Sequence, residues 1–251
     1  MRKKVIAFDL DGTLAESKSA LTDHMAELLN QLLEMFQVCV ISGGKFEQFE
    51  KQLLANLKAS PVKLEALHLM PTCGTRYYLF DVAKGAWKQI YAEDFTPAQK
   101  EKIIQALDKG IDALNYREEK PWGALIEDRG SQITFSALGQ EAPVDAKEAW
   151  DPDNSKKAKL RDYVAGLIPE FEVRSGGTTS IDVTKLGIDK AYGMSKLMEM
   201  LDVSKEEILF MGDRLNEGGN DYPVKAMGID SLEVSSWKDT ALALQAILHV
   251  L

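Results

Sequence analysis

The first part of this chain alternates short apolar runs with segments of helical periodicity. Apolar runs bounded by turn residues occupy positions 4–8 and 37–42, and helical patterns follow them at 21–36 and 45–57. Alternation at this spacing predicts strands and helices that build a parallel sheet. The last part repeats the pattern in the segments KAYGMSKLMEML, ILFMGD, DYPVKAMG, IDSLEV and DTALALQAILHVL. Both ends of the chain therefore predict a doubly wound, Rossmann-like α/β core.

The middle of the chain has a different pattern. It combines a long amphipathic segment at 96–114 with two pairs of strand-like segments, GALIEDR with SQITFSAL and FEVRSG with TTSIDVT. A helix beside hairpin-like strands is typical of an antiparallel α+β unit. Because sheet-like segments resume afterwards, we expect an insertion at 86–186 between core segments 1–85 and 187–251. The stretch DPDNSKK predicts a polar loop with solvated charges.

Polar residues follow the apolar runs of the predicted core. The stretch DLDGT at 9–13 follows the first run, SGG at 42–44 follows the second, and GDRLNEGGND at 212–221 follows ILFM. The carboxyl ends of parallel strands meet at one edge of a sheet, which is where ligands gather. We therefore expect Asp9, Asp11, Ser42 and Asp213 to converge, with Lys190 joining them from the start of a helix. Hard carboxylate oxygens in this number favour Mg²⁺ over zinc.

Structural explanations compete with each of these assignments. Asp-Gly is common in turns, and GDRLNEGGND also reads as a flexible glycine loop. Lys190 is also compatible with an exposed lysine at a helix start, although a cation there opposes the helix dipole. Asp221 fits a helix N-cap as well as the surroundings of a metal ion. The repetition of a carboxylate at two strand ends favours a functional site.

Composition narrows the class of ligand. Of the 251 residues, 45% are hydrophobic and the net charge is -9, so we expect no nucleic-acid partner. The apolar runs are too short for a membrane span, and the two cysteines, Cys39 and Cys73, have neither disulfide nor metal-site spacing. We expect a cytoplasmic protein whose partner is a small molecule.

Taken together, DLDGT, SGG, Lys190 and GDRLNEGGND resemble the four motifs of the haloacid dehalogenase-type phosphotransferases. The resemblance spans nearly the whole chain, and the inserted middle unit implies the subgroup with a large α/β cap. It implies that Asp9 is the nucleophile on phosphorus and that Asp11 is the general acid/base. The implied Mg²⁺ ligands are Asp9, the backbone carbonyl of Asp11 and Asp213, supported by Asp221. The implied phosphate-binding residues are Ser42, Gly43 and Lys190.

Two stretches of the middle unit, EDRGSQITFSALGQ and SGGTTSIDVTKLGIDKAY, resemble the cap of eukaryotic-type phosphomannomutases. That resemblance implies a sugar-phosphate substrate, bound at its far end and hydroxyls by Arg129, Ser180 and Asp182. A surface salt bridge of Arg129 with Asp128 or Glu127 is the structural alternative. For Ser180 and Asp182 the alternative is that they are ordinary outward-facing strand residues.

The chain departs from those mutases at three positions where they carry arginine, which are here Lys18, Gln140 and Lys147. Weaker binding of the distal phosphate would favour attack by water. We therefore expect a phosphomannomutase-like phosphohexomutase, with a sugar-phosphate phosphatase as the alternative. A non-catalytic phosphosugar-binding protein is a third hypothesis, which the intact set of acidic residues and Lys190 disfavours. A homodimer is compatible with the sequence.

Overall fold

The computed structural model describes residues 2–250, except for the side chain of Val144. Met1 and Leu251, the first and last residues of the expected core, lie outside the described residues. The chain divides into two compact units. We call the first, which runs up to Ala92 and resumes at Asp189, the core unit. The second, Glu93–Ile188, is called the cap unit.

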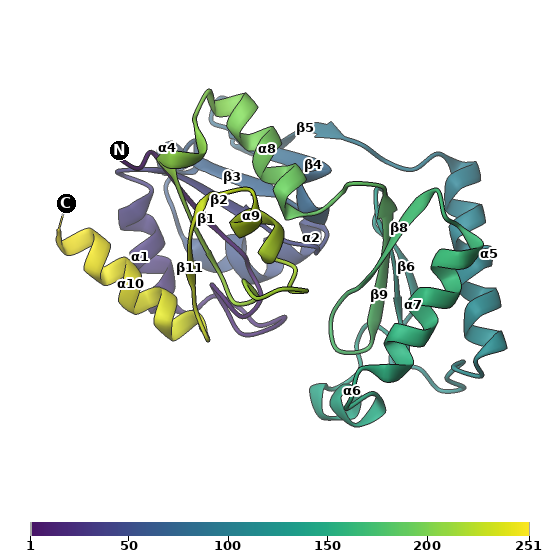
Figure 1. The fold of residues 1–251 in the computed structure, drawn as a ribbon. Coiled ribbons are helices and arrows are strands. Elements are labelled where there is room, and N and C mark those ends of the chain that lie inside the picture. Colours follow the sequence, from purple (N-terminus) through teal and green to yellow (C-terminus); the bar gives the residue numbers. More distant parts are fainter. Residues whose placement is uncertain (1, 251) are drawn as a thin grey trace. The chain divides into compact units, whose positions relative to one another are not determined.

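The core unit is built on a seven-stranded sheet of order β11-β10-β1-β2-β3-β4-β5 (Figure 1). The strands from β11 to β3 are parallel, and β4 and β5 are antiparallel. The strand bounds are β1 Val5–Phe8, β2 Gln37–Ile41, β3 Leu67–Met70, β4 Arg76–Asp81, β5 Ala86–Ala92, β10 Ile208–Gly212 and β11 Asp230–Glu233. The predicted α/β core with a cap is confirmed.

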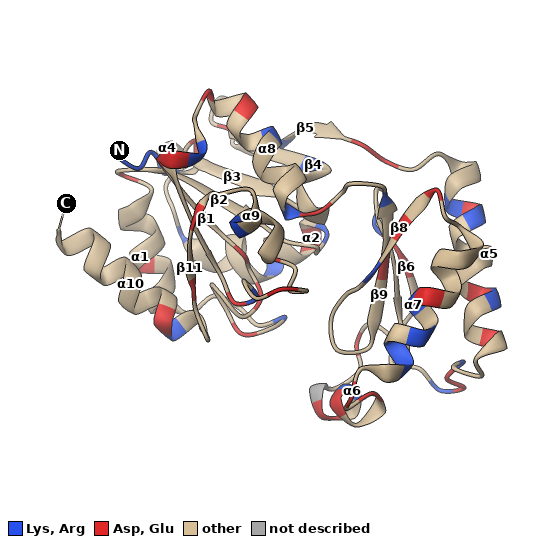
Figure 2. Cartoon of the chain, viewed as in Figure 1, with Lys and Arg blue, Asp and Glu red and all other residues tan. Residues whose placement is uncertain are grey.

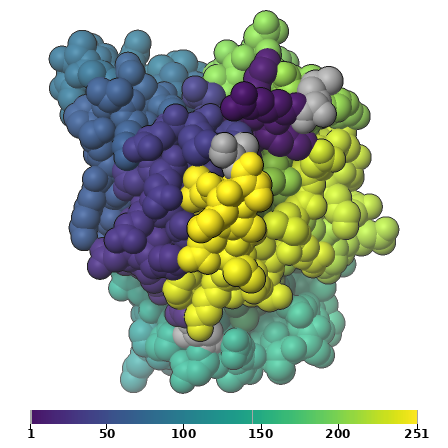
Figure 3. All heavy atoms as spheres, turned by 90° about the vertical axis from the view of Figure 1, so that its left-hand side faces the viewer, coloured from purple at the N-terminus to yellow at the C-terminus, as the bar shows by residue number. Residues whose placement is uncertain are grey.

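Helices cover both faces of the core sheet because successive strand residues point to opposite sides. Ile6 and Phe8 of β1 pack in a cluster with α1 and α10, whereas Val5 and Ala7 pack in a cluster with α8 and α9. Figure 3 shows the C-terminal helix α10 in yellow beside the N-terminal segments. The helices of this unit are α1 Asp23–Leu32, α2 Phe46–Phe49, the π-helix η1 Glu50–Leu54, α3 Ala55–Leu57, α4 Pro61–Leu64, the 3₁₀ turn η2 Thr72–Gly74, α8 Lys190–Leu201, the 3₁₀ turn η3 Lys205–Glu207, α9 Tyr222–Ala226 and α10 Trp237–His249.

The cap unit is a four-stranded antiparallel sheet of order β6-β7-β9-β8. Its strands are β6 Ile126–Asp128, β7 Ile133–Ser136, β8 Phe171–Ser175 and β9 Ser180–Lys185, and its helices are α5 Pro97–Ala113, α6 Val144–Trp150 and α7 Ser155–Leu167. Apolar residues of α5, α7 and one face of the sheet form a single buried cluster. Figure 2 shows that Lys, Arg, Asp and Glu are interspersed along α5 and α7.

Two local expectations need correction. Residues 86–92, which we assigned to the insertion, form β5 and belong to the core sheet because they pair with β4 through a tight turn at 82–85. Residues 187 and 188 lie in the cap unit, so the boundaries fall at 92/93 and 188/189. The stretch DPDNSKK is a solvated loop only in part: residues 152–154 are exposed, whereas α7 begins at Ser155 and Asp151 is 2% exposed and accepts hydrogen bonds from the backbone N–H groups of Lys156 and Lys157.

No helix within residues 2–250 combines the length and the apolar character that a membrane span requires.

Candidate active site

Two carboxylates leave neighbouring parallel strands at the same edge of the core sheet. Phe8, the last residue of β1, pairs with Met211 of β10, and the backbone N–H of Asp9 donates to the Met211 carbonyl at 3.0 Å. Asp213 directly follows the end of β10 at Gly212. The strand register therefore brings Asp9 and Asp213 to one place, as the sequence pattern predicted.

Asp221 joins these residues from the start of α9. Asp9, Asp213 and Asp221 each offer a carboxylate oxygen within 4.8 Å of the other two. Asp221 occupies the N-cap position of α9, yet its side chain makes no capping hydrogen bond. It accepts instead from Lys190 and from the backbone N–H of Arg214 at 3.1 Å. The geometry thus favours a role beside the other carboxylates over a capping role.

Lys190 places a buried cation among the carboxylates. It is the first residue of α8, whose N-cap Asp189 accepts from the backbone N–H of Tyr192. The Lys190 side chain is fully buried, and its Nζ donates to Asp9 Oδ1 at 2.5 Å and to Asp221 Oδ1. The explanation that Lys190 is an exposed lysine at a helix start is therefore wrong.

The electrostatics of this cluster follow from burial and mutual repulsion. Burial raises the pKa of Asp9 to about 7, and the nearby Asp221 and Asp213 add to the rise while Lys190 opposes it. Burial, followed by repulsion from Asp221, also raises the pKa of Asp213. For Lys190, burial would lower the pKa, but attraction to Asp9 and Asp221 outweighs it and the pKa is raised. Three carboxylates and one ammonium leave a surplus of negative charge when all are ionised.

The residues present fit a divalent metal ion. Oδ1 of Asp213 is buried and has no hydrogen-bond partner among the described residues. A buried carboxylate oxygen without a donor is unfavourable unless a cation or another group satisfies it. Because all three groups offer hard oxygen ligands, the cluster suits Mg²⁺.

Position 12 of DLDGT requires glycine, both for its backbone conformation and for the space beside it. Its φ is +83°, in the left-handed region that favours glycine, and a Cβ there would lie 2.6 Å from Asp213 Oδ2. The Asp-Gly sequence is therefore a turn, and that turn packs directly against the carboxylate cluster. The turn explanation is confirmed, and it is compatible with the site explanation.

Asp11 lies outside the carboxylate cluster. Its Oδ1 accepts from the backbone N–H of Lys18 at 2.7 Å and from Gln52 Nε2 at 3.1 Å, and its Oδ2 accepts from Gln48 Nε2 at 2.6 Å. The Asp11 side chain is therefore not part of the carboxylate cluster, and three hydrogen-bond donors fix its position. This placement leaves only the backbone carbonyl of Asp11 for the expected contact with a metal ion.

Ser42 and Gly43 follow β2. Ser42 is buried, its Oγ accepts from the backbone N–H of Gly44 at 3.1 Å, and its backbone carbonyl accepts from the N–H of Cys73. A Cβ on Gly43 would meet no atom within 4 Å, so Gly43 borders open space. The loop is thus anchored at Ser42 and open at Gly43.

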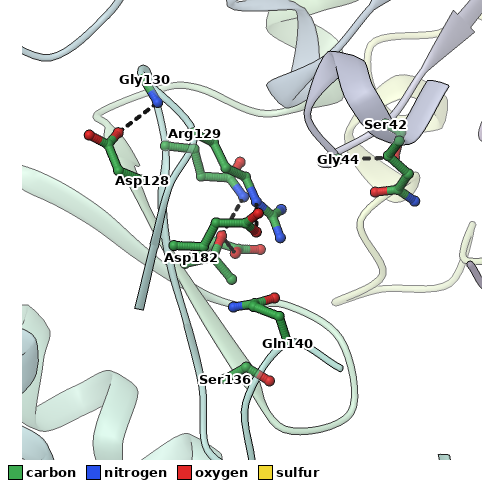
Figure 4. A network of polar contacts seen from close by, with 12 residues as sticks. Ser42, Gly44, Asp128, Arg129, Gly130, Ser136, Gln140 and Asp182 are labelled. Atoms are coloured by element: carbon green, nitrogen blue, oxygen red, sulfur yellow. Dashed lines mark hydrogen bonds and ion pairs between the residues drawn. The ribbon is translucent and has the colours of Figure 1, made fainter. Parts of the chain in front are cut away.

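The expected sugar-binding residues lie in the cap unit (Figure 4). Arg129 Nε donates to Glu127 Oε2 at 2.8 Å, so the ion pair considered as an alternative is present. Asp182 Oδ1 accepts from Thr134 Oγ1 at 2.6 Å, and burial raises the pKa of Asp182. Asp182 and Ser180 alternate along β9 with buried apolar residues and so share one face of the cap sheet.

A close approach places Ser180 and Asp182 side by side. A Cβ on Gly176 would lie 2.6 Å from Asp182 Oδ2 and 2.8 Å from Ser180 Oγ. The pair therefore forms one polar surface on the face opposite the apolar cluster. Gln140 and Lys147 are two of the three positions at which the chain departs from the mutase pattern. Lys147 Nζ donates to the backbone carbonyl of Gln140 at 3.3 Å.

Sequence reasoning did not identify four polar residues that contact the predicted site residues. Gln48 and Gln52 donate to Asp11, and Thr134 donates to Asp182. The Gln132 side chain also hydrogen-bonds to Asp182, and its Nε2 donates to Thr134 Oγ1 at 3.0 Å. The i, i+4 spacing of Gln48 and Gln52 was the only signal available, and it is weak because glutamine is common on exposed helix faces.

A sequence profile of the haloacid dehalogenase-like hydrolases matches residues 6–217. The chain therefore belongs to this family and is an enzyme of the haloacid dehalogenase superfamily. Its relatives include a phosphomannomutase of Encephalitozoon cuniculi, 26% identical over 88% of this chain and 84% of that protein. A phosphomannomutase of Spinacia oleracea is 25% identical over 88% of this chain and 86% of that protein.

Solved structures show the same fold. A Plasmodium falciparum IMP-nucleotidase with bound IMP superposes with a TM-score of 0.70 at 16% identity, over 99% of this chain and 68% of that one. A haloacid dehalogenase-like hydrolase from Bacteroides thetaiotaomicron superposes with a TM-score of 0.63 at 15% identity, over 98% of this chain and 100% of that one. At these identities the likeness supports the fold alone.

Proposed function

We propose that this enzyme catalyses Mg²⁺-dependent phosphoryl transfer on a sugar phosphate and acts as a phosphohexomutase of the phosphomannomutase type. The observation that carries the proposal is the meeting of Asp9, Asp213 and Asp221 around the buried Lys190. The similarity to phosphomannomutases over most of the chain supports the choice of substrate class.

Asp9 is the nucleophile in this proposal. A carboxylate oxygen of Asp9 attacks phosphorus, the bond between phosphorus and the sugar oxygen breaks, and Asp11 gives its proton to the leaving oxygen. The aspartyl-phosphate then passes its phosphoryl group to an acceptor hydroxyl, whose proton goes to Asp11. Lys190 holds Asp9 in place through the 2.5 Å hydrogen bond to Oδ1.

A Mg²⁺ ion would be held by Asp9, Asp213 and the backbone carbonyl of Asp11, with Asp221 in support. When bound, it supplies positive charge that offsets the carboxylates and the phosphoryl oxygens. The buried, unpartnered Oδ1 of Asp213 supports this assignment. Ser42 and the backbone N–H groups of its loop are the proposed ligands of the phosphoryl oxygens.

Hydrolysis by a sugar-phosphate phosphatase is the second candidate. It is favoured by the ion pair of Arg129 with Glu127, which offsets a charge that a distal phosphate would need, and by the contact of Lys147 with the backbone of Gln140, which uses one of the Lys147 donors. A mutase must hold the distal phosphate while the bisphosphate is released and rebound in the opposite orientation. Weak distal binding allows water to take the phosphoryl group instead.

The two candidates differ in their products. Purified enzyme should be given a panel of hexose 1-phosphates with Mg²⁺ and a catalytic amount of hexose bisphosphate, with isomer and free phosphate scored together. The proposal predicts hexose 6-phosphate in excess over free phosphate. Formation of free phosphate alone would establish the phosphatase. The absence of both products would overturn phosphoryl transfer on sugars.

A further inference from the structure

We propose that Gln48 and Gln52 are positioning residues for the catalytic carboxyl of Asp11, a role that rests on the proposed function. Neither residue belongs to the motifs that led to the site. The inference concerns the first chemical step, in which Asp11 delivers a proton to the leaving oxygen.

Both oxygens of Asp11 are held by directed donors. Gln48 Nε2 donates to Oδ2 at 2.6 Å, while Gln52 Nε2 and the backbone N–H of Lys18 donate to Oδ1 at 3.1 and 2.7 Å. Donors on both oxygens fix the rotation of the carboxyl group as well as its position. A proton on such a group is presented in a defined direction, which is what proton transfer in a transition state requires.

The helical segment after the SGG loop directs the amides of Gln48 and Gln52 towards Asp11. Gln48 lies in α2 and Gln52 in the π-helix η1, four residues apart and on one face. π-Helical turns are rare and occur frequently at functional sites. The two amides therefore reach the same carboxyl group from one continuous helical segment.

Gly44 provides the space that Gln48 uses. A Cβ at Gly44 would lie 2.1 Å from Gln48 Oε1 and 2.7 Å from its amide carbon. Any side chain at this position would push the amide away from Asp11. The second glycine of SGG thus serves the placement of Gln48, which the motif alone did not indicate.

Gln52 has an additional structural role. It is buried, its Nε2 also donates to the backbone carbonyl of Ser19 at 2.9 Å, and its backbone carbonyl accepts from the N–H of Leu21 at 2.8 Å. Replacing Gln52 would loosen this segment as well as Asp11. Gln48 is therefore the better residue for a test of positioning.

The leaving group distinguishes positioning of the acid from a general structural effect. Phenyl phosphate and p-nitrophenyl phosphate have nearly the same shape, but phenolate is the more basic leaving group and gains more from a proton. The kcat/KM of each reports formation of the aspartyl-phosphate. Loss of Asp11 positioning must therefore reduce kcat/KM more for phenyl phosphate than for p-nitrophenyl phosphate.

The experiment compares the wild-type enzyme with Gln48→Ala and with Gln48→Met, which retains side-chain length without the amide. Glu47→Ala, an exposed neighbour on α2, is the matched control. Thermal melting verifies that each variant folds. We expect the Gln48 variants to lose about tenfold more on phenyl phosphate than on p-nitrophenyl phosphate, which is a fraction of the roughly 10²–10⁴-fold that general acid–base catalysis contributes. The control should match wild type on both substrates.

A double-mutant cycle completes the test. In an Asp11→Asn background, Gln48→Ala should cause no further loss on phenyl phosphate, because the group that it positions is already gone. Equal losses on the two substrates, or a full additional loss in that background, would overturn the inference while leaving the proposed function intact. The same variants are also assayed with hexose 1-phosphate, where a wild-type enzyme that forms neither hexose 6-phosphate nor free phosphate would overturn the proposed function and the inference with it.

Discussion

At the scale of single residues, the buried ammonium of Lys190 determines whether the carboxylate cluster can exist in the folded protein. Removing two carboxylates and an ammonium from water is costly, and the cost is offset only while the charges are paired. Asp9 and Asp221 both depend on Lys190 for this pairing. Lys190 thus contributes to stability as well as to the proposed chemistry.

We predict that Lys190→Met lowers the free energy of unfolding by about 3–5 kcal/mol, the usual cost of breaking a buried ion pair. Urea unfolding of the variant measures this. Lys159→Met, on the exposed face of α7, is the control and should change stability by at most about 0.5 kcal/mol. A Lys190→Met protein as stable as the control would show that the carboxylates do not need the ammonium.

His68 forms a second buried polar contact in the core unit. Its Nε2 lies 2.7 Å from Gln37 Oε1, which can only accept, so Nε2 carries the proton and Nδ1 accepts from the Tyr77 hydroxyl at 2.6 Å. Burial lowers the pKa of His68 from 6.5 to about 4. The imidazole is therefore neutral in the folded protein at neutral pH.

The lowered pKa predicts a loss of stability in acid. The unfolded chain binds a proton below pH 6.5 and the folded protein does so only near pH 4, so stability falls as the pH drops between these values. The expected loss is about 3 kcal/mol. Because Asp9 titrates in an overlapping range with the opposite sign, the readout is the difference between wild type and His68→Gln. Parallel pH profiles for the two proteins would contradict this prediction.

At the scale of elements, the first turn of α8 must approach the turn η2 closely to position Lys190. Gly74, with φ at +83°, would place a Cβ 2.4 Å from the Cα of Gly193. A Cβ on Gly193 would lie 2.5 Å from Ile41 Cδ1 and 2.7 Å from the Cys73 carbonyl oxygen. This pair of glycines allows α8 to lie against the sheet.

Gly193→Ala should therefore destabilise the core unit by about 1–3 kcal/mol through overpacking, although alanine favours helices. It should also lower turnover because α8 carries Lys190. The control is Gly166→Ala in α7, where a Cβ meets no atom within 4 Å and should stabilise by up to about 1 kcal/mol. Unfolding in urea compares the two variants. Stabilisation by both would show that the close approach is not needed.

The sequence was sufficient to predict the strands and helices whose own residues show an apolar run or an amphipathic period. Buried apolar runs fixed β1, β2 and β10, and the amphipathic period fixed α5. β5 was assigned to the insertion because its residues are mostly exposed and its place in the core depends on pairing with β4. Local periodicity contains no information about such pairing.

The candidate site also contains residues that the sequence predicts and residues that it does not. Asp9 and Asp213 could be predicted together because each follows a parallel strand, so sheet topology alone brings them close. The burial of Lys190 and its contact with Asp221 depend on how α8 and α9 pack, which a single sequence does not specify. The contacts of Gln48 and Gln52 with Asp11 could not be predicted, because amides near a carboxylate form no recognisable sequence motif.

At the scale of the whole molecule, the proposal separates the chemistry of the core unit from substrate recognition by the cap unit. If Arg129 binds the far end of a hexose phosphate, Arg129→Ala should reduce kcat/KM for that substrate on the order of 10²-fold. A small aryl phosphate has no far end and should be affected far less. Arg161→Ala, at a partly exposed arginine of α7 paired with Asp162, is the control. Equal losses on the two substrates would assign Arg129 to the fold.

The central claim is that Asp9 becomes phosphorylated during turnover, and trapping that intermediate tests it most directly. Enzyme mixed with Mg²⁺ and a hexose bisphosphate is quenched in acid within milliseconds, digested and analysed by mass spectrometry. We predict one phosphoryl group on the peptide that contains Asp9, and none in a folded Asp9→Asn variant. Turnover by the wild-type enzyme without phosphate on that peptide, or the same labelling of Asp9→Asn, would contradict the account.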